Sequence, residues 1–405
     1  MEAFTTISLA GFRNHGPATV QLGDRWLWSR DETMGAGPSG HPIPLAPLES
    51  LPVGEQIFWG VPFDITADGG AVWVVLENES WAELPDAVPV PVGARARQLL
   101  VCHFLDAVPT TELRPDDPDD SGAVVAEYIL HYADGSRHVL PIRSRFEINP
   151  CRRAWGMEAF GAVEQDSSHT SPIVGADRDG LTGIASATRG GPTYLLTALA
   201  NPKPEVEIAA IELRATGART ITVAALTLCQ LEHNPFRRSP LTHIEADIAS
   251  PVEADIDLGE VVKTHPFEGG LPDDWLDRPE IGAGELLEDQ PATLIDAIAA
   301  RGARLTIRHS GGESGIAWDE LMEKKTAATD DGLVKLRVLE DRDAWVHVRV
   351  LDKSTGQESP ARVSFYGPRG QYLPPYGHQR DINVNWCEDI GGDLKLGDTS
   401  YAYID

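Results

Sequence analysis

The stretch from residue 124 to residue 146, VVAEYILHYADGSRHVLPIRSRF, decides the fold of this chain. It contains two apolar runs separated by a short polar turn, and the Asp-Gly step at 134–135 supplies the positive backbone φ that a tight hairpin turn requires. Tyr128, Leu130 and Tyr132 recur at every second position, so they share one face of the first strand. The stretch therefore predicts an antiparallel β-hairpin.

Short strand-like runs of the same kind surround this hairpin. FWGVPFDI, AVWVVLEN and ARQLLVCHFLDAV precede it, and three more apolar runs follow between residues 193 and 231. Gly, Pro, Asn and Asp separate the runs, and helical periodicity is almost absent, so residues 50–232 are predicted to form a β-sandwich. Residues 1–49 are rich in Gly and Pro, which predicts an irregular segment packed on that sandwich. Phe160 is expected to be an apolar anchor of a loop-like stretch, and Trp59 and Trp73 are expected in the core.

The composition changes between residues 233 and 331, which are acidic and interrupted by Pro and Gly. This stretch is expected to be a connector. A helical turn is expected near its end, in AWDELMEKK, in addition to the short helix described below. Residues 332–405 return to strand patterns and are expected to form a smaller β domain. The connector's one short helix is expected in PATLIDAIAARGA, where four apolar residues fall at helical spacing: Leu294, Ile295, Ile298 and Ala299.

Charge and cysteine content limit the classes of partner. The chain has 62 Asp and Glu against 34 Lys and Arg, a formal charge of −28, and a field of this sign repels phosphate backbones and anionic lipid headgroups. We therefore expect neither nucleic acid nor membrane as a partner. The N-terminus lacks a signal-peptide pattern, and no apolar run approaches the length of a membrane span. The four cysteines form no CxxC pair, which favours a reducing, cytoplasmic location.

Two groups of segments resemble known families. FWGVPFDI, EYILHYADGSRHVLPIR and ANPKPEVEIAAIEL resemble a galactose-binding-like jelly-roll sandwich, of the kind attached to glycan-processing enzymes. VHVRVLDKSTGQESPARVSFYGPRGQYLPPYGH and GGDLKLGDTSYAYID resemble the carboxypeptidase-regulatory-like (prealbumin-like) module that precedes the catalytic domain in PHP metallohydrolases of the carbaryl-hydrolase type. In that family the metal site begins, along the sequence, with a His-x-His pair that follows the module. None of the twelve histidines here lie two positions apart.

The resemblance implies the N-terminal β-sandwich region of such a hydrolase without its catalytic domain. The predicted fold class is therefore all-β: a galactose-binding-like jelly-roll sandwich, a short helical connector, and a smaller prealbumin-like β-sandwich over 332–405 that lacks its last strands. If a larger enzyme is formed, the resemblance implies a metal-dependent hydrolase.

Standard catalytic patterns are missing from the sequence. It contains no HExxH, no GxSxG, no P-loop and no Cys/His cluster with metal-ligand spacing. The leading hypothesis is therefore a non-catalytic module that binds a carbohydrate or small-molecule ligand or docks a partner. The side chains singled out for ligand binding are aromatic or imidazole groups, with core packing as the competing interpretation: Trp155, Trp275, Tyr376, His378 and Trp386.

The loop over residues 376–393 leaves an alternative function open. Glu388, Asp389 and Asp393 could supply the acid and base of a self-contained glycoside hydrolase. The same loop offers oxygen and nitrogen ligands for a cation such as a structural calcium ion, although the same residues could equally cap turns. The candidate metal ligands are His378, Asp381, Asp389 and Asp393.

The last predicted strand, Tyr401 to Ile404, suggests a docking edge. If its sheet partners lie beyond residue 405, its unpaired backbone groups would be a template for another strand. A catalytic partner chain or a second copy of this chain is the expected source of that strand.

Overall fold

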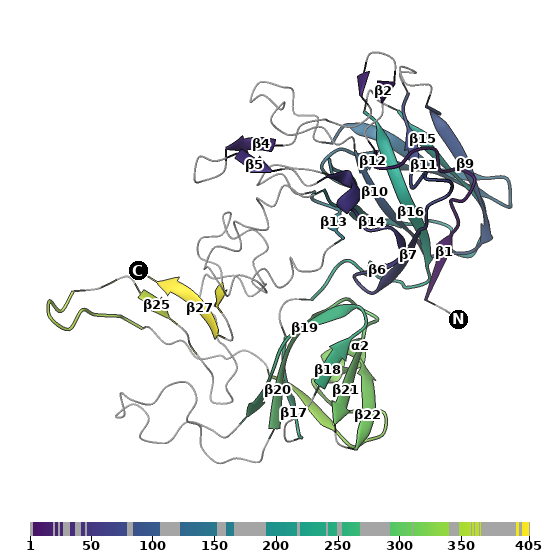
Figure 1. The fold of residues 1–405 in the computed structure, drawn as a ribbon. Helices are drawn as coiled ribbons and strands as arrows, with labels where there is room; N and C mark the ends of the chain where they lie inside the picture. The colour runs from purple at the N-terminus through teal and green to yellow at the C-terminus, as the bar shows by residue number, and fades with distance from the viewer. Residues whose placement is uncertain are drawn as a thin grey trace. The chain divides into compact units, whose positions relative to one another are not determined.

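The computed structural model is nearly all-β, with one α-helix among the residues that it describes (Figure 1). This confirms that the chain is all-β, as predicted. The chain forms two compact units, the first made of Met1–Ser167 and Ile184–Phe236 and the second of Ser168–Gly183 and Arg237–Asp405. The structure describes residues 3–18, 21–22, 25–26, 33–36, 42–44, 47–78, 84–105, 122–151, 159–165, 192–216, 219–239, 242–248, 253–267, 292–309, 311–339, 348–357, 359, 361–363, 365, 394–396 and 399–404.

A six-stranded antiparallel sheet forms the centre of unit one. It consists of β1 (Phe4–Ile7), β8 (Val74–Leu76), β10 (Gln98–Leu105), β13 (Val163–Glu164), β14 (Leu195–Ala200) and β16 (Ile221–Cys229). Its order is β1-β16-β10-β14-β13, and β8 also pairs with β16. Every residue of β10 and β16 is buried. A sheet covered on both faces explains why these strands are continuous apolar runs without alternation.

A four-stranded antiparallel sheet covers one face of this sheet. Its strands are β9 (Ala87–Ala94), β11 (Val124–Tyr132), β12 (Arg137–Arg143) and β15 (Ile208–Ala215), in the order β12-β11-β15-β9. The predicted hairpin is confirmed as β11 and β12, and Gly135 has the positive φ of 82° that its turn needs. Tyr128, Leu130 and Tyr132 are buried together in the core between the two sheets, as predicted. Unit one is therefore a β-sandwich.

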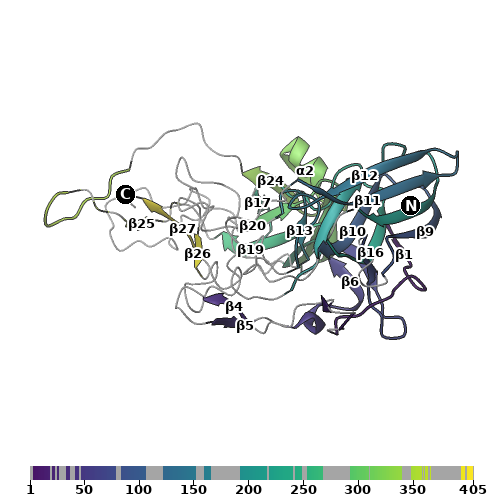
Figure 2. The ribbon, with the colours of Figure 1, turned by 90° about the horizontal axis from the view of Figure 1, so that it is seen from above.

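A second core covers the opposite face of the six-stranded sheet. The hairpin of β6 (Gly54–Phe58) and β7 (Val61–Ile65) contributes to this core, and Figure 2 shows β6 and β11 on opposite sides of β10. Trp73 is fully buried here and Trp59 is 9% exposed, so both predictions of core tryptophans are confirmed.

The turn between β6 and β7 places a bulky residue in a strained conformation. Trp59 and Gly60 both have positive φ, 57° and 79°, in the two-residue loop that joins the strands. Such a loop suits the strand twist but is unusual for an aromatic residue. The indole Nε1 donates a hydrogen bond of 2.8 Å to the Glu164 carbonyl, and the ring lies edge-on to Phe236 at 6.4 Å. These contacts hold the indole in the second core despite the backbone strain.

The N-terminal segment differs in part from the irregular chain that was expected. β1 is a full member of the central sheet, with Phe4 opposite Cys229 and Ile7 opposite Leu226. Two further short hairpins lie before residue 47: β2 (Gln21–Leu22) with β3 (Arg25–Trp26), and β4 (Thr33–Ala36) with β5 (Pro42–Pro44).

Unit two contains two sheets where a connector was expected over residues 233–331. One sheet has the order β19-β20-β17-β24-β23 and the other β18-β21-β22 (Figure 1). The second predicted helical turn is confirmed as α2 (Trp318–Lys324). The strands are β17 (Thr242–Ala246), β18 (Glu253–Ile256), β19 (Gly259–Phe267), β20 (Ala292–Ala299), β21 (Arg304–His309), β22 (Gly312–Ala317), β23 (Thr326–Ala328) and β24 (Lys335–Leu339).

The helix predicted in PATLIDAIAARGA is wrong, because this segment is strand β20. Every residue of β20 is buried, and it lies between β19 and β17 in its sheet. A strand covered on both faces has apolar residues at nearly every position, so Leu294, Ile295 and Ile298 also satisfy a helical spacing. The charged exception is Asp296, whose carboxylate is paired across the sheet with His243.

A small sheet lies near the C-terminus. β27 (Thr399–Ile404) confirms the strand predicted there, and it lies between β25 (Ala361–Val363) and β26 (Leu394–Leu396). Its first half pairs with β26 and its second half with β25. The condition stated for a docking edge, that the partners of this strand lie beyond residue 405, is therefore not met by β27. Strand addition elsewhere at this sheet, by a partner chain or a second copy, stays a prediction.

Candidate functional site

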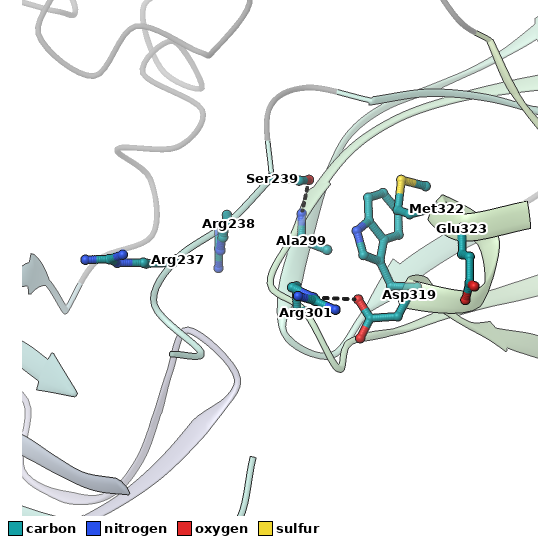
Figure 3. A pocket seen from close by; sticks show the side chains of 9 residues that line it. Arg237, Arg238, Ser239, Ala299, Arg301, Asp319, Met322 and Glu323 are labelled. Atoms are coloured by element: carbon teal, nitrogen blue, oxygen red, sulfur yellow. Dashed lines mark hydrogen bonds and ion pairs between the residues drawn. The ribbon is translucent and has the colours of Figure 1, made fainter. Parts of the chain in front are cut away.

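A pocket of about 600 Å³ lies in unit two, between the segment that leads into β17 and helix α2 (Figure 3). Three arginines and two carboxylates line it, together with an apolar floor. Trp318 contributes to the floor and is only 1% exposed, so its ring supports the pocket and does not offer a free face. The lining residues are Arg237, Arg238, Ser239, Ala299, Arg301, Trp318, Asp319, Met322 and Glu323.

Backbone contacts fix the two walls of this pocket. The Ser239 N–H donates to the Ala299 carbonyl at 2.7 Å, which ties the entering segment to the end of β20. The Ala299 N–H donates to the Ser239 hydroxyl oxygen at 3.3 Å. On the α2 side, the Asp319 carboxylate accepts the Gly302 N–H at 3.0 Å and lies 3.6 Å from the Arg301 guanidinium.

The two inner arginines differ in their exposure. The Arg238 side chain is 6% exposed and lies 3.6 Å from the Glu260 carboxylate. Burial lowers the pKa of Arg238 to about 10, an effect that Glu260 opposes, so the guanidinium is still charged at neutral pH. The Arg301 side chain is 64% exposed, and its pair with Asp319 is of the weak surface type.

A second candidate site, the aromatic platform of Phe146 and Phe160 with Arg143 and Arg145, lies at the end of β12. Phe160, which was expected to be an apolar anchor of its loop, is 69% exposed. Its ring centroid is 5.3 Å from that of Phe146, with a tilt of 57°. The Arg145 guanidinium carbon lies 5.2 Å from the Phe160 centroid, and that of Arg143 lies 4.5 Å from the Phe146 centroid. Both cations are within the range of a cation–π contact.

The backbone holds the aromatic platform rigidly. The Phe160 N–H donates to the Arg145 carbonyl at 2.8 Å, and the Gly161 N–H donates to the Phe146 carbonyl at 2.9 Å. A Cβ at Gly161 would lie 3.0 Å from the Phe146 carbonyl oxygen, so this close approach favours glycine. Arg145 has a positive φ of 61°, a strained conformation for a long side chain that is often found at functional sites.

The Arg143 side chain is committed to Glu147. Its Nε and Nη2 donate to the two carboxylate oxygens of Glu147 at 2.9 and 2.5 Å. This hydrogen bonding raises the pKa of Arg143. Arg143 therefore positions the ring of Phe146, and it is Arg145 that lies against the exposed ring of Phe160.

The buried histidine of unit one is a structural residue. His103 is fully buried; its Nδ1 lies 2.8 Å from the Tyr128 hydroxyl, and its Nε2 lies 2.9 Å from the Glu147 carbonyl. Because a carbonyl oxygen only accepts, Nε2 carries the proton and Nδ1 accepts from Tyr128. Burial lowers the pKa of His103 to about 4 and raises that of Tyr128. Both ring nitrogens are satisfied within the core, and this ring does not open onto either candidate site.

A histidine–carboxylate pair lies on the five-stranded sheet of unit two. His243 on β17 is opposite Asp296 on β20, and its Nδ1 lies 2.7 Å from a carboxylate oxygen of Asp296. Both side chains are 12% exposed. The pair explains how a carboxylate is accommodated in a strand of buried residues, because the imidazole supplies the hydrogen bond that burial requires.

The thiols of unit one are not available as nucleophiles. Cys102, Cys151 and Cys229 are buried thiols outside any disulfide. Burial raises the pKa of Cys229 to about 11 and that of Cys102 well above its usual range, so both are protonated at neutral pH. Within the described ranges, no group of three or more His, Cys, Asp and Glu could hold a metal ion, and no helix is long and apolar enough to cross a membrane.

The residues that the sequence singled out for binding, metal ligation and catalysis all lie outside the described residues. Their roles stay predictions. They are Trp155, Trp275, Tyr376, His378, Asp381, Trp386, Glu388, Asp389 and Asp393.

Sequence reasoning missed both candidate sites. The arginine-lined pocket unites segments that lie far apart in the sequence, around Arg238, Arg301 and Asp319, and no local motif links them. The aromatic platform had a local signal, because the RSRF run at 143–146 places two cations next to an aromatic residue. The exposure of Phe160 has no counterpart in the sequence pattern.

Comparison with known proteins identified no relative of this chain. No family model, no curated protein and no solved structure matches this chain.

Proposed function

We propose that this chain is a non-catalytic carbohydrate-binding β-sandwich protein whose sugar contact is the aromatic platform. The observation that carries the proposal is the exposure of Phe160, 69%, on a ring that two backbone hydrogen bonds and a guanidinium hold in place. Aromatic rings provide the apolar contact for the C–H face of a sugar, and a few polar groups orient its hydroxyls. A ring fixed before binding also loses little conformational entropy when the sugar arrives.

The charged groups of the platform suit a polar ligand. Arg145 carries several N–H donors beside the Phe160 ring, and guanidinium groups bind sugar hydroxyls and carboxylates through such donors. The galactose-binding-like subtype of the sandwich belongs to this proposal, and the two facing antiparallel sheets support it. An association with a metal-dependent hydrolase rests on the resemblance of the sequence segments alone.

Replacing Phe160 with alanine is expected to weaken glycan binding by about tenfold, because an aromatic contact contributes about 0.5–1.5 kcal/mol beyond the burial of its apolar area. Phe160→Trp is expected to keep the affinity or raise it, since the larger ring offers more stacking area. A glycan array would identify the ligand, and isothermal titration calorimetry would then compare the variants on that ligand.

Ile57→Ala is the matched control, because Ile57 is 75% exposed on another hairpin and its removal also deletes exposed apolar surface. Unchanged affinity in the control and loss in Phe160→Ala would support the platform. The absence of any glycan ligand, or equal affinity in Phe160→Ala and the native chain, would overturn it. Robust turnover in a hydrolase screen of the purified chain would contradict the non-catalytic part of the proposal.

A further inference from the structure

The charges in the pocket of unit two are separated between its walls. Figure 3 shows Arg238 on the segment that enters β17, with Asp319 and Glu323 on helix α2 at the other side of the pocket. Arg301 lies between them, beside Asp319. The guanidinium of Arg237 points away from α2 in the same view. One wall therefore favours a negative group and the other a positive group.

The pocket floor between these walls is apolar. Trp318, Met322 and Ala299 line it, and Trp318 is fixed by near-complete burial. Small-molecule sites commonly combine such a floor with a few charged groups that set the orientation of the ligand. A ligand that matches this arrangement has a carboxylate at one end, a cationic group at the other and a hydrocarbon part in contact with the floor.

We propose that the pocket binds a small zwitterion of the α-amino-acid type with an apolar side chain. Arg301 receives its carboxylate, because a planar guanidinium matches the geometry of a carboxylate and can bind both oxygens. Arg238, whose guanidinium also lies 3.6 Å from the Glu260 carboxylate, flanks this end of the ligand. Asp319 and Glu323 receive its ammonium group. The pair of Arg301 and Asp319 opens at little cost, since both side chains are partly exposed, at 64% and 43%, and lie 3.6 Å apart.

A simple phosphate ion fits this pocket less well than a zwitterion. Phosphate carries more negative charge and no positive group, so the two carboxylates on α2 would repel it. The whole chain, with its charge of −28, adds to that repulsion. A zwitterion has no net charge and does not meet this barrier.

The test uses three probes that share the isobutyl group, measured on the full chain by isothermal titration calorimetry. L-leucine carries both charges, 4-methylpentanoate only the carboxylate, and 3-methylbutylamine only the ammonium group. We expect leucine to bind, and each single-charge analogue to bind about tenfold more weakly or not at all, because each lacks one charge-assisted contact. No heat of binding with leucine at millimolar concentration, or equal affinity for leucine and 4-methylpentanoate, would overturn the proposal.

Surface variants separate the two ends of the ligand without affecting the fold. Arg301→Gln is expected to weaken both leucine and 4-methylpentanoate by about tenfold, and Glu323→Gln to weaken leucine and leave 4-methylpentanoate unchanged. The matched controls lie outside the pocket lining: Arg308→Gln, whose guanidinium pairs with Glu313 at 2.7 Å, and Glu320→Gln, whose carboxylate pairs with Lys324 at 2.7 Å. Equal losses in a variant and its control would contradict the proposed contact. Phe160→Ala leaves leucine binding unchanged, so this inference and the glycan proposal can fail separately.

Discussion

Replacing Trp73 with alanine is expected to lower the free energy of unfolding of unit one by about 4 kcal/mol, since deletion of a buried tryptophan leaves a large cavity. Trp73 is fully buried, and its indole lies edge-on to Phe104 at a centroid distance of 5.3 Å. Its Nε1 donates to the Tyr194 hydroxyl at 2.9 Å, so the substitution also removes the partner of a buried polar group. Chemical denaturation followed by circular dichroism measures the change.

Two other variants check the origin of this loss. Trp73→Phe keeps much of the packing and removes the N–H donor, so it should cost about 1–3 kcal/mol. Ile57→Ala removes an apolar side chain that is 75% exposed and should change stability by less than about 0.5 kcal/mol. If Trp73→Ala cost less than about 1 kcal/mol, the second core of unit one would not be packed as described.

Unit one is expected to lose about 3 kcal/mol of stability from His103 alone as the pH falls from 6.5 to 4. The pKa of His103 is about 4 in the folded chain against an ordinary value of 6.5, mainly because burial penalises the charged ring. Between these two pH values the unfolded chain binds a proton that the folded chain does not bind. Stability therefore rises with pH across this window, and the contribution is complete above pH 6.5.

A difference measurement isolates this contribution from the protonation of the many carboxylates. His103→Gln keeps a donor for the Glu147 carbonyl but does not titrate, so its stability should fall less steeply between pH 6.5 and 4 than that of the native chain. Denaturant midpoints at a series of pH values give both slopes. Parallel slopes would show that His103 takes up its proton in the folded state as easily as in the unfolded state.

The strands that could be predicted from the sequence are those whose pattern lies in neighbouring residues. The Asp-Gly turn at 134–135 and the alternation of Tyr128, Leu130 and Tyr132 identified the hairpin of β11 and β12, because turn geometry and a half-buried face both leave a pattern in neighbouring residues. The short apolar runs after residue 192 were recognised as β14, β15 and β16 for the same reason.

The failures arise where burial on both faces removes that pattern. In β20, the run of Leu294, Ile295 and Ile298 fits a helical stripe as well as a strand, and only its neighbours β17 and β19 decide the outcome. The acidic residues around it suggested a connector, although β20 itself is buried. The run FWGVPFDI predicts one strand. In the structure Trp59 and Gly60 turn the chain there, between β6 and β7.

The candidate sites were harder to predict because they depend on tertiary placement. Nothing near Arg238 in the sequence indicates that α2 lies across a pocket from it. Exposure of Phe160 depends on how residues 160 and 161 pair with residues 145 and 146, and the sequence contains no signal for this backbone pairing.

The pairing of β1 with β16 has a consequence for how the protein is made. Phe4 leaves the ribosome early, whereas its partner Cys229 emerges only after most of unit one has been synthesised. At translation rates of about 5–20 residues per second, this delay is roughly ten to forty-five seconds. The apolar Ile7 and Leu9 stay without their final neighbours during that time. Strand β1 is therefore placed only after β16 has been made, and the nascent chain has a long interval in which chaperones can bind this segment.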